Sequence, residues 1–579
     1  MDANARPRRI VVIGAVAAGT SAAAKARRND EEAEIVLYER DRHISYSGCG
    51  MPYYIGGLLS DFKEIVPRDA AYFKKKYNVD VRIRHEVVSV DPEAYTLTVK
   101  NLETGETFGD RYDTQVLATG AMPVILPVPG VEGDHVFPLR NPTHALGIRG
   151  FLEQRHPESA VVIGSGFIGL EMVENLAHAG LAVSLVEKLP HVCPFVDPDL
   201  SPYVLEALEQ HGVTVRTRLS ASAIRPREVE LEDGSTLPGD LVILAVGIRP
   251  ETGLARAMGV ALGANGAIQV DESMRTNLPD VYACGDCAEN VSIVDRRRFY
   301  RPLGATANKT GRICGDVITG GPLVHRGVAG TGIFLVFDRA VAATGLNERE
   351  ARATGRDVVV SHNIKPDRPD YLGGREMVIK TIADRADGTL LGVQIVGFEG
   401  VDKRIDVLVT AMTAGLKAAD LFHLDLAYAP PFSTTKDPVH YTGMILENAL
   451  ARGRELLGGD QLAAAGEGTY TVVDARVPAQ YDAGHVPGAI NLPQEQVREA
   501  LAGLDRNKPI VTYCNKGVTG NAVQNILLNH GFKRVYTLSG GFRQFQSCRV
   551  AAGKLNCKDA ARRIVENEAV RPALQKDGR

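Results

Sequence analysis

Residues 160–169 read AVVIGSGFIG, and this stretch decides the fold. The apolar run predicts a buried strand, Gly164, Gly166 and Gly169 have the spacing of a tight phosphate-binding turn, and an apolar helix follows. The next predicted strand ends at Glu187, which follows Gly164 by 23 residues. Such a unit binds a dinucleotide pyrophosphate at the helix N-terminus, and the acidic residue binds a free ribose 2′-hydroxyl. We therefore expect NADH as the nucleotide, while the adjacent Lys188 leaves NADPH open.

The N-terminal region carries a relaxed copy of this pattern. Residues 9–13, RIVVI, predict a buried strand that runs into Gly14, and Val16 takes the place of the second glycine before Gly19. Glu39 follows the next predicted strand, 25 residues after Gly14. An ordinary strand-helix-strand turn is the alternative here. Two such units nevertheless predict an α/β protein that binds two dinucleotides.

Composition excludes several other classes of protein. At about 150 residues per domain, the 579 residues predict three or four domains. Lys+Arg is 66 and Asp+Glu is 70, a net charge of −4, which argues against nucleic acid or a polybasic membrane anchor as partner. No uninterrupted apolar stretch reaches the roughly 20 residues of a membrane span. Eight scattered cysteines suit a reducing compartment, so a cytoplasmic location is expected.

A third motif indicates which dinucleotides are bound. Residues 276–286, TNLPDVYACGD, resemble the second flavin signature of the pyridine nucleotide-disulfide reductases, and residues 118–120 and 245–247 resemble that family's domain-crossing turns. The resemblance implies FAD in the first fold and NADH in the second, which is inserted within the first. It places FAD against Gly14, Ala17, Ala18, Gly19, Glu39, Arg40, Val87, Ala118, Thr119, Gly120, Gly285, Asp286 and Ala307. It places the nicotinamide nucleotide against Gly164, Gly166, Phe167, Ile168, Gly169, Glu187 and Gly247.

One cysteine carries the expected redox chemistry. In this family Cys49, within SYSGCGMPYY (45–54), stands at a helix start beside the flavin, a position expected to lower a thiol pKa. Ile44 and Tyr54 stand where a disulfide partner five residues away would be needed, so Cys49 is expected to cycle as a sulfenate or a mixed disulfide. A buried structural cysteine is the alternative. Cys284 and Cys287 have CxxC spacing but are interpreted as structural.

The pattern Ser-x-x-x-Cys-Gly-x-Pro-Tyr resembles the coenzyme A disulfide reductases, over residues 8 to about 450. In that family the tyrosine equivalent to Tyr428, within YAPPFS, comes from the partner subunit, so the resemblance implies a homodimer. Tyr428 is the candidate proton donor, with a core interface tyrosine as the alternative, and Tyr371 is a second candidate. The 3′-phosphate of coenzyme A calls for cations. Family position gives the substrate-binding candidates Lys25, Arg28, Ser45, Lys76, Asn308 and Lys436.

The C-terminal region resembles a rhodanese over about residues 460–550. The resemblance rests on GHVPGAIN (484–491) and on Cys514 in the loop CNKGVTG (514–520), where backbone N–H groups and a helix N-terminus hold an anionic sulfur. Many rhodaneses have arginines where Asn515 and Thr519 stand, which leaves Lys516 as the loop's cation. Thiosulfate is therefore expected to bind less well than a larger persulfide.

These observations predict two Rossmann-like domains for FAD and NAD, an α+β dimerisation domain and an α/β rhodanese domain. The expected boundaries are 1–150 and 271–330 for FAD, 151–270 for NAD(H), 331–450 for dimerisation, 451–468 for a linker, 469–550 for the rhodanese and 551–579 for a tail. The expected activity is NADH-dependent reduction of a coenzyme A disulfide, a persulfide or polysulfide through Cys49, with Cys514 handling sulfane sulfur and hydrogen sulfide released. An NADH oxidase or peroxidase, and a sulfur-carrier or redox-sensing flavoprotein, are the alternatives. No metal site is expected.

Overall fold

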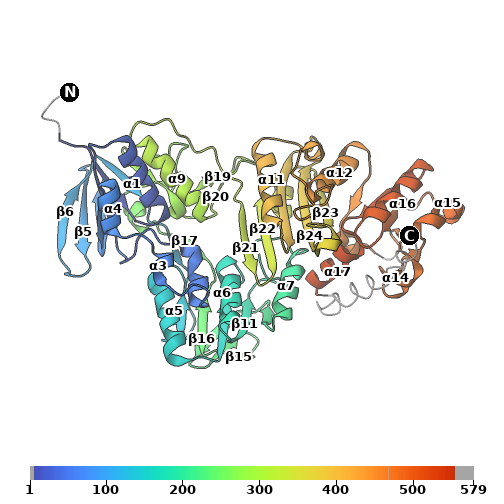
Figure 1. Ribbon diagram of the computed structural model, residues 1–579, viewed down its shortest axis with the longest axis horizontal. Coiled ribbons are helices and arrows are strands. Elements are labelled where there is room, and N and C mark those ends of the chain that lie inside the picture. Colours follow the sequence, from blue (N-terminus) through green and yellow to red (C-terminus); the bar gives the residue numbers. More distant parts are fainter. Residues whose placement is uncertain (1–5, 467, 554–579) are drawn as a thin grey trace. The chain divides into compact units, whose positions relative to one another are not determined.

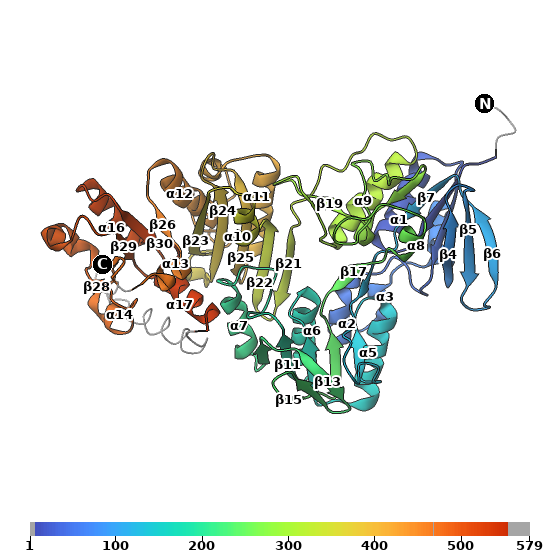
Figure 2. The same cartoon turned by 180° about the vertical axis from the view of Figure 1, so that it is seen from behind.

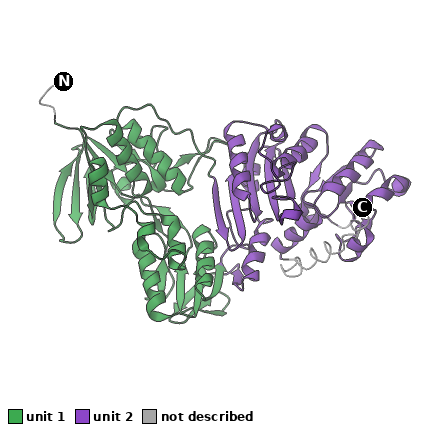
Figure 3. Ribbon diagram, viewed as in Figure 1, with its two compact units in different colours: residues 1–186, 220–330 green, residues 187–219, 331–579 purple. Residues whose placement is uncertain are grey.

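The computed structural model describes residues 6–466 and 468–553, and the chain divides into two compact units (Figure 3). Unit 1 comprises residues 1–186 and 220–330, and unit 2 comprises residues 187–219 and 331–579. Most of the predicted tail, with Cys557, lies outside the described residues. No helix in the described ranges is long and apolar enough to cross a membrane.

Unit 1 contains two parallel sheets (Figure 1). The first has the order β18-β7-β1-β2-β3, with helices α1 (Ala17–Asn29) and α9 (Gly304–Val317) packed against one another beside it. Within the unit, the second has the order β11-β10-β16-β9, with α5 (Pro142–Arg155) and α6 (Phe167–His178). The strands are β1 (Arg9–Ile13), β2 (Glu34–Glu39), β3 (Asp80–Ile83), β7 (Thr114–Leu117), β18 (Val281–Ala283), β9 (Val136–Pro138), β10 (Ser159–Ile163), β11 (Ala182–Glu187) and β16 (Leu241–Leu244).

Antiparallel strands complete unit 1. They form the three-stranded sheets β4-β5-β6 and β13-β14-β15, the pair β19 (Asn290–Val291) and β20 (Arg298–Phe299), and the pair β8-β17, which links the two nucleotide folds. Their bounds are β4 (His85–Asp91), β5 (Thr96–Asn101), β6 (Thr107–Arg111), β8 (Ala121–Pro123), β13 (Ala221–Arg225), β14 (Glu228–Leu231), β15 (Thr236–Pro238) and β17 (Ile248–Pro250).

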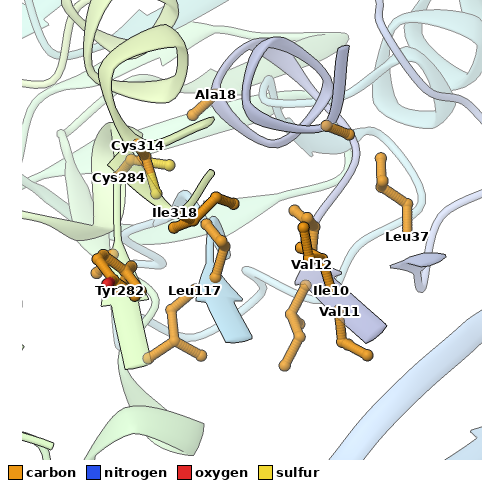
Figure 4. Close-up of a cluster of buried hydrophobic side chains, with 14 of the residues drawn as sticks. Ile10, Val11, Val12, Ala18, Leu37, Leu117, Tyr282, Cys284, Cys314 and Ile318 are labelled. Atoms are coloured by element: carbon orange, nitrogen blue, oxygen red, sulfur yellow. The ribbon is translucent and has the colours of Figure 1, made fainter. Parts of the chain in front are cut away.

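The core of the first sheet explains its continuous apolar strands. Every residue of β1 is buried, because parallel strands inside such a sheet are covered on both faces. Figure 4 shows Val12 and Leu117 beneath Ala18, with Cys284 and Cys314 close together at one side. Both cysteines are fully buried and free. This burial supports the structural interpretation of Cys284, and Cys287 is equally buried.

Unit 2 begins with the short segment 187–219, which contains α7 (Ser201–Gln210) and β12 (Thr214–Thr217). An antiparallel sheet of order β21-β22-β25-β24-β23 follows, and it includes the hairpin β24-β25 that the sequence predicted. Helices α11 (Val401–Thr413) and α12 (Pro438–Ala451) pack on this sheet. The strands are β21 (Gly332–Val336), β22 (Arg339–Gly345), β23 (Val358–Pro366), β24 (Glu376–Asp384) and β25 (Leu390–Gly397).

The C-terminal part of unit 2 is a parallel sheet of order β26-β30-β29-β27-β28, drawn from behind in Figure 2. Helices α13 (Gly459–Ala464), α14 (Pro478–Asp482), α16 (Val518–Asn529) and α17 (Gly541–Ala551) accompany it. The strands are β26 (Leu456–Leu457), β27 (Thr471–Asp474), β28 (Ile490–Asn491), β29 (Ile510–Tyr513) and β30 (Val535–Leu538).

Buried polar contacts hold these parts of unit 2 together. Lys380 on β24 is almost completely buried, and its ammonium lies 2.9 Å from Asp199 and 2.8 Å from Glu348. Although desolvation opposes it, the ammonium of Lys380 and the ring of His362 hold the pKa of Asp199 well below its usual range. His362 on β23 lies 2.6 Å from Asp199 and also bonds Ser539, just after β30. β23 is thereby fixed against the C-terminal sheet.

Candidate active sites

The first glycine turn has the backbone form that a dinucleotide needs. Gly14 has φ +103°, and a Cβ there would lie 2.8 Å from the carbonyl carbon of Ala118, so only glycine is accommodated. α1 begins without a side-chain cap at Val16 and without an acidic residue in its first turn. Its first N–H groups are therefore available to a pyrophosphate, with Ala17, Ala18 and Gly19 in the first turn of α1.

Glu39 lies at the end of β2 with a buried carboxylate. Its two oxygens accept hydrogen bonds from the backbone N–H groups of Ala15 (2.8 Å) and Asp41 (2.9 Å), while burial raises its pKa. A carboxylate retains further acceptor sites beyond these two bonds, so a ribose hydroxyl is compatible with this position. The residues predicted to contact FAD all lie in unit 1, and Arg40 is 3.7 Å from Glu251 there.

Asp286, the predicted flavin-binding carboxylate, lies in the turn Gly285–Cys287 directly after β18. It accepts a hydrogen bond of 2.9 Å from Arg140, whose Nε donates to the carbonyl of Ala121. Tyr300 donates to the backbone carbonyl of Asp286 at 2.9 Å. Sequence reasoning missed Arg140 and Tyr300, because nothing in their local patterns marks them as neighbours of Asp286.

The second glycine turn repeats this geometry around β10 and α6. Gly164 has φ +102° and donates its N–H to the carbonyl of Val186 at 2.8 Å. α6 begins after Gly166 with no side-chain cap and no acidic residue in the first turn, which contains Phe167, Ile168 and Gly169. Gly247 has φ +116°. Because both turns leave the first N–H groups of a helix without a side-chain cap, both fit a dinucleotide.

Glu187 ends β11, as the sequence predicted. Its side chain is buried, and one carboxylate oxygen accepts a hydrogen bond of 2.8 Å from the N–H of Leu189. The preference for NADH that this carboxylate implies stays a prediction.

Cys49 lies in the single turn Gly48–Gly50, which leads into the short helix α2 (Met51–Ile55). Of the seven cysteines in the described residues, it is the exposed one, and all seven are free. The expectation of a lowered pKa is wrong. Although the side chain is exposed, surrounding protein atoms desolvate the thiol and raise its pKa, the carboxyls of Glu171 and Asp286 add to this effect, and Arg140 opposes it.

Glu171 on α6 is a second group that sequence reasoning missed. Burial, and to a smaller extent the charge of Glu174, raise its pKa to about 7. Glu171 therefore titrates near neutral pH, and its charge changes the proton affinity of Cys49. A glutamate in the helix after a glycine turn carries no local signal for this role, which depends on where α2 packs against α6.

Four of the residues predicted to bind coenzyme A lie on three neighbouring helices of unit 1. α1 carries Lys25 and Arg28 and packs against α4 (Ala70–Tyr77), with Lys76, and against α9, with Asn308. Each of these four side chains already contacts a charged, polar or aromatic group within the subunit. Lys25 lies 2.9 Å from Asp316, Arg28 stacks over the Tyr77 ring, Lys76 donates to Tyr72, and Asn308 accepts from Ser21. Ser45, with φ +49°, donates its backbone N–H to Ala15.

The remaining reductase candidates lie in unit 2. Tyr371 and Tyr428 are 75% and 48% exposed, so neither phenol is buried in a single subunit. Lys436 is exposed just before α12. Exposure leaves both tyrosines available to a partner subunit, and their catalytic roles stay predictions.

Cys514 directly follows β29 and lines a pocket of about 370 Å³. Gly517, which has φ +106° and caps α16, directs its backbone N–H to the Cys514 sulfur at 3.2 Å. Arg476, paired with the buried Asp474, donates to the Asn515 side chain at 3.2 Å and so supports the loop. The loop therefore has the form that holds an anionic sulfur, as the sequence predicted.

The pocket also contains a lysine that sequence reasoning did not place there. Lys365 comes from the end of β23, in the antiparallel sheet, and lines the pocket together with Cys514 and Lys516. Its ammonium lies over the ring of Tyr441 at 4.0 Å from the ring centroid.

With this geometry in view, the chain belongs to the pyridine nucleotide-disulphide oxidoreductase family, which matches residues 8–307. The dimerisation domain of the same family matches residues 332–438, and a rhodanese-like domain matches residues 460–548. These matches confirm the predicted fold class and the kinds of domain.

One curated relative covers three quarters of the chain, and two solved structures cover more than nine tenths of it. The NAD(P)H sulfur oxidoreductase (CoA-dependent) of Pyrococcus furiosus is 36% identical over 447 residues, 76% of this chain and 99% of the relative. The reduced Bacillus anthracis CoADR-RHD is 36% identical with a TM-score of 0.91, covering 94% of this chain and 98% of that one. An NAD-dependent persulfide reductase from A. fulgidus is 35% identical with a TM-score of 0.85, covering 93% and 99%.

Proposed function

We propose that this protein is a flavin-dependent NADH reductase of coenzyme A disulfide, coenzyme A persulfide or polysulfide, with a rhodanese module that handles sulfane sulfur. The observation that carries this proposal is the pair of thiols in different settings. Cys49 is exposed beside the flavin-type turn of Asp286, and Cys514 faces a separate pocket with a backbone N–H on its sulfur. The names of the relatives support the same substrate class.

The chain's own residues divide the proposed reaction between them. The Cys49 thiolate attacks the disulfide or persulfide of the substrate, and the leaving thiolate takes a proton from Tyr428 or Tyr371 of the partner subunit. Glu171, which titrates near neutral pH, accepts or returns the proton of Cys49. Bound NADH and FAD supply the hydride and electron transfer that returns Cys49 to the thiol. Within unit 1, Lys25, Arg28 and Lys76 are the cations proposed to bind the phosphates of coenzyme A.

The proposal includes a homodimer in the cytoplasm. The dimerisation domain and the two exposed tyrosines support the dimer. Seven free cysteines in the described residues suit a reducing compartment.

The test is Cys49→Ser, with Cys287→Ser as the matched control. Cys287 is buried, and its sulfur contacts the carbonyls of Leu117 and Cys284, which a serine hydroxyl also bonds. We expect Cys49→Ser to abolish NADH oxidation with coenzyme A disulfide, coenzyme A persulfide and polysulfide, while bound FAD keeps its visible spectrum. Cys287→Ser is expected to stay near wild type.

Three outcomes would overturn the proposal. Near-normal turnover by Cys49→Ser would remove this thiol from the reaction. NADH oxidation that needs oxygen but none of the sulfur substrates would favour the oxidase alternative, and stoichiometric rather than catalytic NADH consumption would favour the redox-sensing alternative.

A further inference from the structure

The rhodanese loop has Asn515 and Thr519 where many rhodaneses have arginines, yet the pocket around Cys514 is not short of positive charge. Three cationic side chains line it, namely Lys365, Arg476 and Lys516, against one carboxylate, Glu495, which is exposed. What matters for an incoming anion is which of these charges is already neutralised.

Two of the three cations are paired with acids. Arg476 and Asp474 form a fully buried ion pair. Lys516 pairs with Glu376 on β24, and Glu376 also pairs with Arg543 at the start of α17. The Glu376 carboxylate thus binds both Lys516 and Arg543, and the pair with Lys516 fixes the Cys514 loop against the antiparallel sheet.

Lys365 is the cation that this arrangement leaves uncompensated. Among residues 6–466 and 468–553, no carboxylate lies within ion-pair distance of its ammonium and no acceptor lies within hydrogen-bond distance. The ammonium instead makes a cation–π contact with the Tyr441 ring. Burial lowers the pKa of Lys365, the charges of Lys516 and Lys436 lower it further, and Cys514 raises it. A half-buried ammonium with cationic neighbours is stabilised by an anion in the same pocket.

We propose that Lys365, supplied by the dimerisation domain, is the anion-binding residue of the Cys514 pocket. The pocket accordingly takes small sulfane-sulfur donors whose negative charge lies next to the sulfur that is transferred. The inference rests on the proposed sulfur transfer at Cys514, and it replaces the expectation, drawn from the loop alone, that small anions bind poorly there.

The transfer step balances without a cofactor. The Cys514 thiolate attacks the outer sulfur of a donor such as thiosulfate, a bond forms between the two sulfurs, and the donor's sulfur–sulfur bond breaks. The electron pair of that bond leaves on sulfite. Cys514 becomes a persulfide whose terminal sulfur carries a negative charge, and Lys365 faces that charge as well as the charge of the donor.

The Cys514 pocket is built from two domains, because Lys365 belongs to the dimerisation domain and Cys514 to the rhodanese-like domain. β23 is fixed to the C-terminal sheet through His362 and Ser539, whose hydroxyl accepts the His362 N–H at 2.8 Å. Lys365 follows His362 by three residues on the same strand and lines the pocket together with Cys514. The rhodanese module on its own therefore lacks the residue that binds the anion.

The experiment compares an anionic and a neutral alkylating reagent on the reduced holoenzyme. Iodoacetate and iodoacetamide react with the same thiolate, so the ratio of their rates at Cys514, followed by peptide mass spectrometry, reports the charge of the pocket. We expect Lys365→Met to lower this ratio about fivefold, the effect of one partly screened charge. Lys365→Arg, which keeps the charge, is expected to keep the ratio within about twofold. Lys533→Met, at an exposed lysine outside the pocket, serves as the control for net charge and should not change it.

If Lys365→Met changes the iodoacetate and iodoacetamide rates by the same factor, Lys365 has a merely structural role and the proposal is overturned. The proposal is also overturned if neither rate changes. Sulfur transfer from thiosulfate provides the second readout, in which Lys365→Met should raise KM at least fivefold with a smaller change in kcat. If the ratio falls as expected but the wild type transfers no sulfur from any donor, the anion site stands and the proposed function of Cys514 fails. If the wild type transfers sulfur and the ratio does not fall, the assignment of Lys365 fails alone.

Discussion

Gly164→Ala tests the nucleotide-binding turn at a position where the backbone leaves no room for a side chain. An added Cβ would lie 2.7 Å from the carbonyl carbon of Ala245 and 3.1 Å from the N–H nitrogen of Val246, against the 3.4 Å or more of an ordinary contact. Either the turn or the end of β16 must move, by a distance of the order of 1 Å. Misplacement of this size costs about 100-fold in rate, or about 2.7 kcal/mol of transition-state stabilisation. We expect kcat/KM for NADH to fall by that factor while FAD stays bound, because Gly14 and α1 are unchanged.

Gly180→Ala is the matched control for this experiment. Gly180 has φ +93°, close to the +102° of Gly164, so both variants carry the same left-handed strain of about 1–2 kcal/mol. A Cβ at Gly180 meets no atom within 4 Å, and the collision is therefore specific to Gly164. Steady-state NADH oxidation and the FAD content of both variants provide the readout. Equal losses in the two variants, or a Gly164→Ala enzyme within twofold of wild type, would refute the reasoning.

Three further outcomes are expected. Glu187 repels a 2′-phosphate, so kcat/KM should be higher for NADH than for NADPH, and the reverse preference would show that a nearby cation outweighs this carboxylate. Cys514→Ser should keep the reduction of small coenzyme A disulfides, because that reaction needs Cys49. The variant should lose all sulfur transfer and the reduction of bulky persulfides. Equal loss of both reductase activities would mean that the two modules form one site. Desolvation and, after it, the charge of Glu171 raise the pKa of the Cys49 thiol, so thiolate forms only at a higher pH than for an ordinary cysteine. Glu171→Gln should shift the pH profile of Cys49 alkylation by iodoacetamide to lower pH, and an unshifted or raised profile would exclude Glu171 as a cause.

The thiol of Cys49 shows the limit of reading a position from its family. A cysteine at a helix start is expected to have a lowered pKa because N–H groups at a helix N-terminus favour an anion. Here the helix α2 is only five residues long, surrounding protein atoms desolvate the thiol and raise its pKa, and the carboxyls of Glu171 and Asp286 raise it further. Nothing near residue 49 in the chain reports these two carboxyls.

Sequence alone determined the features that depend on a few consecutive residues. A turn that approaches a pyrophosphate requires glycine at positions such as Gly14 and Gly164, where φ is positive and a side chain would strike a neighbouring strand, so the residues themselves identify the strand, the turn and the helix. The order of these motifs, with the Cys514 loop after them, was enough to predict the domains, and the family matches confirmed their kinds.

Tertiary structure alone decided which charges meet at each site. Arg140 reaches Asp286 across 146 residues, and Lys365 lines the pocket of Cys514 across 149, each by the packing of elements whose own sequences are ordinary. Local sequence specifies backbone conformation because φ and ψ are set by sterics within a few residues. The pKa and the charge of a site depend instead on burial and on neighbours from distant strands, which only the folded chain brings together.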